Sequence, residues 1–331
     1  MANNAHGARQ GVAWTMAASM LAIAAAAPVL AQIQIWPTKR VTVVVPFAPG
    51  SATDLLPRTV FDHVSARVGQ PIIIENRPGG GGSIGVSAVA KAEPDGHTIL
   101  VHSNALVTAP AIQSMPYDPV RDFAGITTLG NVPLVLVISP DKNIKTLKEF
   151  VAAAKEKPGS MNYAAAGIGT PPHLTMERFR LAAGFEGQVV PFKGAPEALT
   201  EILAGRVDVY FAPITPALAF IREGKLLALA VSSSKRASAL PDVPTTIEAG
   251  FPDSDFDFWI GMVVPKKTPR ETVARIHEET VKGLQDPSVK DKLAKLGVEE
   301  MIMTPEDFDT RIAKEAPIAM ALAKAAGIAA K

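Results

Sequence analysis

Strand-like and helix-like segments alternate along most of this 331-residue chain, and this alternation constrains the fold more than any other feature. The strand-like segments are continuous apolar runs, often β-branched, as in strands buried on both faces. They cover residues 41–45, 71–75, 97–101, 132–138, 162–165, 188–191, 207–211 and 226–231. They are separated by helical patterns at residues 59–68, 84–91, 146–157, 172–183, 195–204 and 215–223. The alternation is typical of parallel, doubly wound α/β sheets.

The pattern changes near residue 258, because one further predicted strand at 259–264 is followed only by helices. Thr268-Pro-Arg-Glu271 is a capping box with proline at the first helical position, and helices are predicted at 269–284, 287–296 and 305–328. A single strand with several amphipathic helices completes an existing domain rather than forming a new one. At about 150 residues per domain, the length also predicts two domains.

We therefore predict two α/β lobes with a discontinuous first lobe. Lobe 1 comprises residues 32–136 and 259–331, and lobe 2 comprises residues 137–258. The chain crosses between the lobes twice, which predicts a two-segment hinge with a ligand cleft between the lobes.

Residues 1–31 are predicted to be a cleaved secretory signal peptide. Arg9 is the only lysine, arginine or acidic residue before Lys39, an apolar run spans residues 11–27, and small residues precede Gln32. The alternative is a membrane anchor, but the run is Ala-rich and shorter than the roughly 20 residues that a bilayer requires. We expect an exported protein whose mature chain begins at Gln32.

Composition excludes several classes of function. The chain has no cysteine, which excludes disulfides, iron–sulfur clusters, thiolate zinc sites, a cysteine nucleophile and a lipid anchor on an N-terminal cysteine. The 33 basic and 32 acidic residues become 32 of each without residues 1–31. A balance near zero argues against a general nucleic-acid binder, which needs a basic face.

The loop at residues 46–54 is the first candidate site. It joins the first strand to the first helix, and ligands of open α/β sheets bind outside the carboxyl ends of strands. Ser51 and Thr53 supply hydroxyls, and the N–H groups that open the helix favour a small anion such as a carboxylate. The alternative is an ordinary strand-to-helix turn with Thr53 or Asp54 as the helix cap.

Two loops of the second lobe are comparable. Residues 166–173 combine two glycines, which allow close backbone approach, with Thr170 as a cap and donor and with His173. Residues 191–194 follow the next predicted strand and contain Lys193. The alternatives are a structural histidine and a solvated lysine, and the residues alone leave both open.

Other motifs argue against catalysis and nucleotide binding. Gly80, Gly82 and Gly85 form a G-x-G-x-x-G pattern, but it follows the second strand and no acidic residue ends the next strand. The six histidines have no metal-ligand spacing, and the chain lacks a G-x-S-x-G nucleophile motif. An exported α/β enzyme that uses the same cleft remains the alternative to a binding protein.

Taken together, the loop motifs resemble those of one family. They are VPFAPGSATD ending at Asp54 with Arg58, ENRPGGGGSIG at 75–85, PDGHT at 94–98, YDPVRDF at 117–123, AGIGT at 166–170 with His173, PFKG at 191–194, GRVD at 205–208 and LPDVPT at 240–245. The mature chain resembles, over essentially its whole length, the Bug family of extracytoplasmic solute receptors of tripartite tricarboxylate transporters.

The resemblance implies a type II periplasmic-binding-protein fold and a periplasmic, monomeric receptor without cofactor or metal. It implies a small ligand that bears carboxylates, held partly through ordered waters, and membrane components of a transporter or a sensor as partners. The ligand-binding residues carried over by position are Phe47, Ala48, Gly50, Ser51, Ala52, Thr53, Asp54, Ser103, Asn104, Ala166, Gly167, Gly169, Thr170, His173, Lys193 and Gly194. Ser51 stands where the family usually has glycine and Pro57 where it has alanine, so the pocket shape differs from the usual one.

Overall fold

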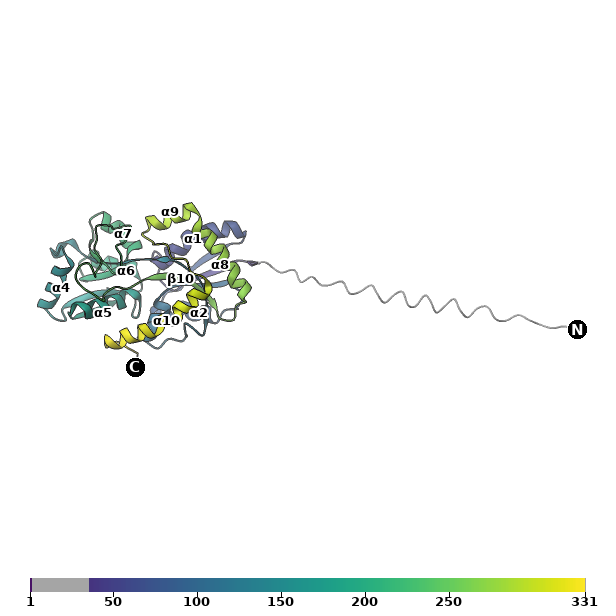
Figure 1. Ribbon diagram of the computed structural model, residues 1–331, viewed down its shortest axis with the longest axis horizontal. Helices are drawn as coiled ribbons and strands as arrows, with labels where there is room; N and C mark the ends of the chain where they lie inside the picture. Colours follow the sequence, from purple (N-terminus) through teal and green to yellow (C-terminus); the bar gives the residue numbers. More distant parts are fainter. Residues whose placement is uncertain (2–35, 331) are drawn as a thin grey trace. The chain divides into compact units, whose positions relative to one another are not determined.

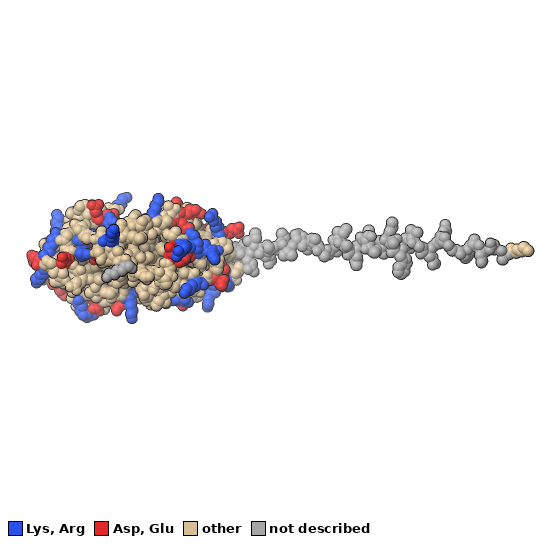
Figure 2. All heavy atoms as spheres, turned by 90° about the horizontal axis from the view of Figure 1, so that it is seen from below, with Lys and Arg blue, Asp and Glu red and all other residues tan. Residues whose placement is uncertain are grey.

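The computed structural model describes Met1 and residues 36–330, and the predicted signal peptide at residues 1–31 lies outside the part described apart from Met1 (Figure 1). In the segment from Trp36 to residue 330, no helix combines the length and the apolar character needed to cross a bilayer. On the face seen in Figure 2, basic and acidic side chains are interspersed, in keeping with the balanced charge.

The first lobe is built on a five-stranded sheet in the order β2-β1-β3-β10-β4. Its strands are β1 (Val41–Val45), β2 (Ile72–Asn76), β3 (Thr98–Ser103), β4 (Phe123–Asn131) and β10 (Trp259–Pro265). Its helices are α1 (Ala52–Val68), α2 (Ser83–Ala90), α3 (Ala105–Thr108), α8 (Arg270–Gln285), α9 (Pro287–Lys295) and α10 (Pro305–Ala325). The apolar run of β1 explains its position inside the sheet between β2 and β3, because Val41, Val43 and Val45 are fully buried.

The second lobe repeats the plan with the strand order β7-β6-β8-β5-β9. Its strands are β5 (Leu134–Ile138), β6 (Met161–Ala165), β7 (Gly187–Pro191), β8 (Val209–Pro213) and β9 (Leu227–Val231). Its helices are α4 (Leu147–Glu156), α5 (Pro171–Ala183), α6 (Ala195–Leu203) and α7 (Ile214–Arg222). Thr146 caps α4 by accepting a hydrogen bond from the Glu149 N–H, as the capping box predicts.

The two-lobed α/β fold is confirmed, but both sheets are mixed. Parallel pairing holds for β2-β1-β3 and for β7-β6-β8. β10 runs antiparallel to β3 and β4, and β5 runs antiparallel to β8 and β9. β5 and β10 are the strands by which the chain enters each sheet from the other lobe, so no crossover helix sets their direction.

β4 was not predicted from the sequence. Its residues, FAGITTLGN, include two glycines and three polar residues, and they lack the apolar run that marks the other strands. The strand forms because β10 supplies a long antiparallel partner.

The chain crosses between the lobes at two adjacent segments. The first lies between Asn131 and Leu134, a few residues before the predicted boundary at 136, which falls inside β5. The second leads into β10 at Trp259. The Val132 N–H donates to the Phe258 carbonyl at 2.8 Å, so the two crossing segments lie side by side.

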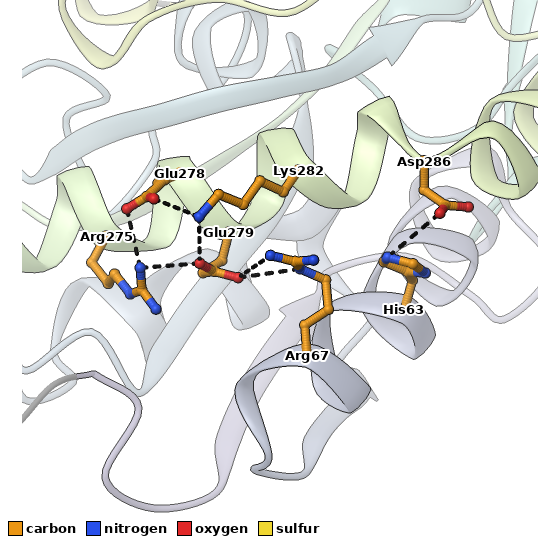
Figure 3. A network of polar contacts seen from close by, with 7 residues as sticks. All are labelled: His63, Arg67, Arg275, Glu278, Glu279, Lys282 and Asp286. Atoms are coloured by element: carbon orange, nitrogen blue, oxygen red, sulfur yellow. Dashed lines mark hydrogen bonds and ion pairs between the residues drawn. The ribbon is translucent and has the colours of Figure 1, made fainter.

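An ionic network joins α1 to α8 in the first lobe (Figure 3). Its centre is Glu279, whose side chain is only 4% exposed and lies within 3.0–3.3 Å of Arg67, Arg275 and Lys282. The network therefore holds α1, the helix whose N-terminus faces the second lobe. α1 begins at Ala52, earlier than the predicted residue 59, and it accommodates Pro57.

Candidate functional site

A small cavity lies between the lobes and is called here the inner cavity. Its volume is about 30 Å³. Loops that follow β1 and β3 of the first lobe, loops that follow β6, β7 and β8 of the second, and the second crossing segment supply its walls. The lining residues are Phe47, Ser51, Ala52, Thr53, Ser103, Ala166, Thr170, Pro171, Pro172, Gly194, Ala195, Pro213 and Phe258. The carboxyl ends of strands from both sheets therefore meet at one point, as expected for open α/β sheets.

The inner cavity is surrounded by helix N-termini and has no cationic side chain among its described lining residues. None of the described residues that line it is charged. The N-termini of α1, α5 and α6 meet there at Ala52, Pro171 and Ala195, and no side chain caps any of them. Helix N-termini carry partial positive charge and N–H groups without intrahelical partners. The arrangement therefore suits a small anion.

The three helices contribute unequally. Ala52 and Thr53 carry N–H groups in the first turn of α1, and Ala195 carries one in α6. Pro171 and Pro172 occupy the first two positions of α5 and have no N–H group to offer. α5 therefore contributes its dipole, whereas α1 supplies most of the backbone donors.

The hydroxyls around the inner cavity are buried and are partly paired with one another or with the backbone. The Ser51 and Thr53 hydroxyl oxygens lie 3.3 Å apart. Thr170 donates to the Gly167 carbonyl at 2.7 Å, although its side chain does not cap α5 as predicted. The Ser103 hydroxyl accepts from the Ala105 N–H at 3.3 Å. Each hydroxyl oxygen can take part in further hydrogen bonds.

Asp54 organises the first loop instead of lining the inner cavity. Its carboxylate accepts hydrogen bonds of 2.9 Å from the Gly50 N–H, the Arg58 Nε and the Asn76 amide. Burial raises the pKa of Asp54, but the hydrogen bonds from Arg58, Gly50 and Asn76 outweigh burial and lower the pKa overall. The side chain therefore stays ionised and fixes the loop that leads into α1. It does not cap the helix as the sequence suggested, because Ser51 occupies the N-cap position and no side chain caps it.

His173 lies behind the second-lobe loop and lines neither this cavity nor the neighbouring one described below. Its Nδ1 accepts a 3.2 Å hydrogen bond from the Gly169 N–H, and its ring stacks on Tyr163 at 6.2 Å. Burial lowers the pKa of His173, with Glu177 opposing that shift. A neutral imidazole that accepts at Nδ1 holds the loop in place.

A larger outer cavity of about 410 Å³ adjoins the inner one and shares Phe47 and Ala166 with it. The other lining residues are Pro46, Gly79, Gly80, Gly81, Gly82, Gln113, Gly167, Ile168, Pro191, Phe192, Lys193 and Glu197. Lys193 is exposed at this site, and its backbone N–H donates to the Glu197 carboxylate at 3.0 Å. The glycine run at residues 79–82, whose pattern does not fit a nucleotide-binding motif, therefore forms one wall of the outer cavity.

The remaining predicted residues surround the cavities. Ala48 and Gly50 lie where the lobes meet, because a Cβ at Gly194 would be 3.3 Å from the Ala48 Cβ and one at Gly50 would be 3.7 Å from Pro196. Asn104 instead donates to the Asp257 carbonyl at 2.9 Å and lines a separate pocket beside the crossing segment.

Sequence reasoning missed several lining residues. Pro213 ends β8, and its position at the carboxyl end of a predicted strand is a signal that identifies it. Phe258 and Gln113 carry no such signal, because neither follows a strand-to-helix motif. Across residues 36–330, no three His, Asp or Glu side chains come together in a way that would hold a metal ion.

Comparisons with known proteins agree with this geometry. The profile of the "tripartite tricarboxylate transporter family receptor" matches residues 56–328. The chain is similar to protein BugT of Bordetella pertussis, with 33% identity over 88% of this chain and 89% of BugT.

Solved structures give the same result. A Rhodopseudomonas palustris protein solved with adipate superimposes with a TM-score of 0.86 at 31% identity, covering 89% of this chain and 100% of that one. MatC from the same species, with bound malate, has a TM-score of 0.82 at 31% identity, covering 87% of this chain and 99% of MatC. The periplasmic binding protein BugD has a TM-score of 0.84 at 32% identity, covering 89% and 100%.

These relatives are solute-binding proteins and not enzymes, which favours the first of the two functions considered from the sequence. The chain therefore belongs to the tripartite tricarboxylate transporter receptor family and carries its two-lobed solute-binding fold.

Proposed function

We propose that this chain is a periplasmic receptor that captures a small organic carboxylate between its lobes and presents it to the membrane components of a tripartite tricarboxylate-type transporter or of a sensor. The observation that carries the proposal is the inner cavity, where three helix N-termini and four buried hydroxyls surround a space with no charged lining residue among those described. The related proteins solved with adipate and with malate support the carboxylate class.

The energetics suit reversible capture. A partly buried helix terminus contributes up to about 2 kcal/mol toward an anion, and a charge-assisted hydrogen bond contributes about 1.5–3 kcal/mol. Micromolar affinity corresponds to about 8 kcal/mol. The N–H groups of Ala52, Thr53 and Ala195, together with the hydroxyls of Ser51 and Ser103, therefore suffice after ordering costs, and binding needs neither metal nor covalent chemistry.

Each of the two cavities holds a different part of the ligand. The inner cavity has little more than the volume of one water molecule, so it accommodates a carboxylate end after a small separation of the lobes. The outer cavity, with Lys193 at its edge, takes the body and any second carboxylate. Asp54, Asn104 and His173 act on the ligand through the loops that they hold.

Ligand screening tests the proposal. Malate, adipate, longer dicarboxylates and aromatic acids are added to the purified protein, and the melting temperature is recorded. A ligand at 100 times its dissociation constant stabilises the fold by about 2.7 kcal/mol. Failure of every acid to raise the melting temperature would overturn the carboxylate assignment.

Two variants locate the site. Thr53→Val removes a cavity hydroxyl and is expected to weaken binding of the best acid about tenfold. Thr59→Val is the matched control, because Thr59 lies on the same helix and donates to the Leu55 carbonyl outside both cavities. Equal affinities for the two variants would contradict the placement of the site.

Export and oligomeric state are tested separately. The mass of the protein recovered from the periplasmic fraction is expected to correspond to a chain that begins at Gln32. Analytical ultracentrifugation is expected to give a monomer with and without ligand. Recovery of the bound acid without chemical change separates capture from turnover.

A further inference from the structure

A buried hydrogen bond joins the two lobes beside the inner cavity. The Thr108 hydroxyl, at the end of α3 in the first lobe, donates to the Gly169 carbonyl of the second lobe at 2.6 Å. Thr108 is only 3% exposed. It lines neither the inner nor the outer cavity.

The backbone N–H and carbonyl of Gly169 are both held by hydrogen bonds, one from each lobe. Its N–H donates to His173 within the second lobe, and its carbonyl accepts from Thr108 of the first. A Cβ at Gly169 would lie 2.7 Å from the Ala109 Cα, so the backbones of the two lobes are in close contact here. The Gln113 amide adds a longer contact of 3.4 Å to the Ile168 carbonyl.

The same loop forms walls of both cavities. Ala166 and Thr170 line the inner cavity, and Gly167 and Ile168 line the outer one. A bond that holds Gly169 against the first lobe therefore also holds these walls together. When the lobes separate, the Thr108 hydroxyl and the Gly169 carbonyl exchange this bond for bonds to water.

We propose that Thr108 is an interlobe latch, a residue that raises ligand affinity by stabilising the closed lobes without contacting the ligand. The inference rests on the proposed capture of a ligand between the lobes. Because the bond forms as the lobes close, losing it favours the open lobes with or without ligand. For the bound protein this increases the dissociation rate and leaves the association rate nearly unchanged. A buried hydrogen bond of this kind corresponds to a change in dissociation constant of about tenfold.

The test uses threonine-to-valine substitutions, because valine has nearly the size of threonine but no hydroxyl. Thr108→Val removes the latch, and Thr108→Ser keeps the hydroxyl. Thr128→Val is the control, because the fully buried Thr128 donates to the Met301 carbonyl at 2.7 Å within the first lobe alone. With adipate and malate as probes, calorimetry is expected to show about tenfold weaker binding for Thr108→Val and wild-type binding for the other two.

A second measurement needs no ligand. Since the chain has no cysteine, Ile84→Cys in α2 and Gln188→Cys in β7 place one spin label on each lobe at exposed positions. Thr108→Val is expected to shift the distribution of label distances away from the closed value, whereas Thr128→Val leaves it unchanged.

The two measurements separate the latch from the ligand class. An unchanged distance distribution for Thr108→Val overturns the latch, and so does an unchanged dissociation constant for a probe that binds the wild type. If neither adipate nor malate binds the wild type, the choice of ligand fails, and the label distances alone decide whether Thr108 holds the lobes together.

Discussion

The imidazole of His102 makes the stability of this protein depend on pH in a way that can be calculated. His102 is the last residue but one of β3, next to Ser103, and is 1% exposed. Its Nδ1 lies 3.0 Å from the Ser103 carbonyl, its Nε2 has no hydrogen-bond partner, and its ring packs edge-on against Phe47 at 5.3 Å. Burial lowers the pKa of His102 to about 3, and the hydrogen bond to Ser103 opposes this larger effect.

The direction in which stability changes with pH follows from proton binding to the folded and the unfolded protein. Below the ordinary histidine pKa of about 6.5, the unfolded chain binds a proton at His102 that the folded protein does not bind until the pH approaches 3. Stability is therefore full well above pH 6.5 and falls as the pH is lowered through 6.5. One proton corresponds to about 1.4 kcal/mol per pH unit, and the unfolded imidazole is half protonated at pH 6.5, so His102 lowers the free energy of unfolding by about 2 kcal/mol between pH 6.5 and pH 4.5.

Urea denaturation at several pH values, followed by the fluorescence of the buried Trp36 and Trp259, measures this slope. His102→Leu keeps a similar volume and cannot titrate. The lowered pKa of His173 acts in the same direction in both proteins, so the difference between the two slopes isolates His102. The free energy of unfolding of the wild type is expected to fall by about 2 kcal/mol more than that of the variant over this range. Parallel slopes would refute the reasoning.

Three further substitutions test other parts of the structure. Gly194→Ala is expected to weaken carboxylate binding about five- to tenfold by crowding Ala48 at 3.3 Å, with Ala48→Gly restoring affinity in calorimetry; additive effects of the two changes would contradict contact between the lobes here. Asp54→Asn removes the charge that accepts hydrogen bonds from Gly50 and Arg58. Denaturation is expected to show a free energy of unfolding lower by about 2 kcal/mol, together with weaker binding of the carboxylate. Glu279→Gln is expected to lower the free energy of unfolding by about 1–2 kcal/mol at low salt and by less at 1 M salt, because its three cationic partners are 36–40% exposed. Carboxylate affinity should not change, and a change would show that the α1–α8 contact affects the cleft.

The elements that local patterns mark most strongly were predicted well. The apolar runs that became β1, β3 and β6 and the capping box of α4 lie where the sequence places them, within a few residues. Their signals are local, since burial on both faces and the capping of a helix are decided within a few neighbouring residues. β4 lacks such a signal, because its partner β10 is more than 120 residues away in the chain.

The residues of the candidate site were likewise predicted only in part. The hydroxyls of Ser51, Thr53 and Thr170 were identifiable from loops between strands and helices, and the structure brings them to one cavity. His173 and Asn104 have the chemistry of ligand-binding residues, yet their side chains bond to Gly169 and Asp257. Nothing in the sequence reveals which way a buried polar side chain turns, because its partners come from other segments.

The sequence by itself determined the alternation of strands and helices and the type of loop that opens each helix. The tertiary structure alone decided that α1, α5 and α6 point at one cavity, that Phe258 closes it from the crossing segment, and that Thr108 bonds to Gly169 across the lobes. The physical reason is range, since periodicity and capping act over a few residues, whereas cavity walls and interlobe bonds depend on how distant segments pack.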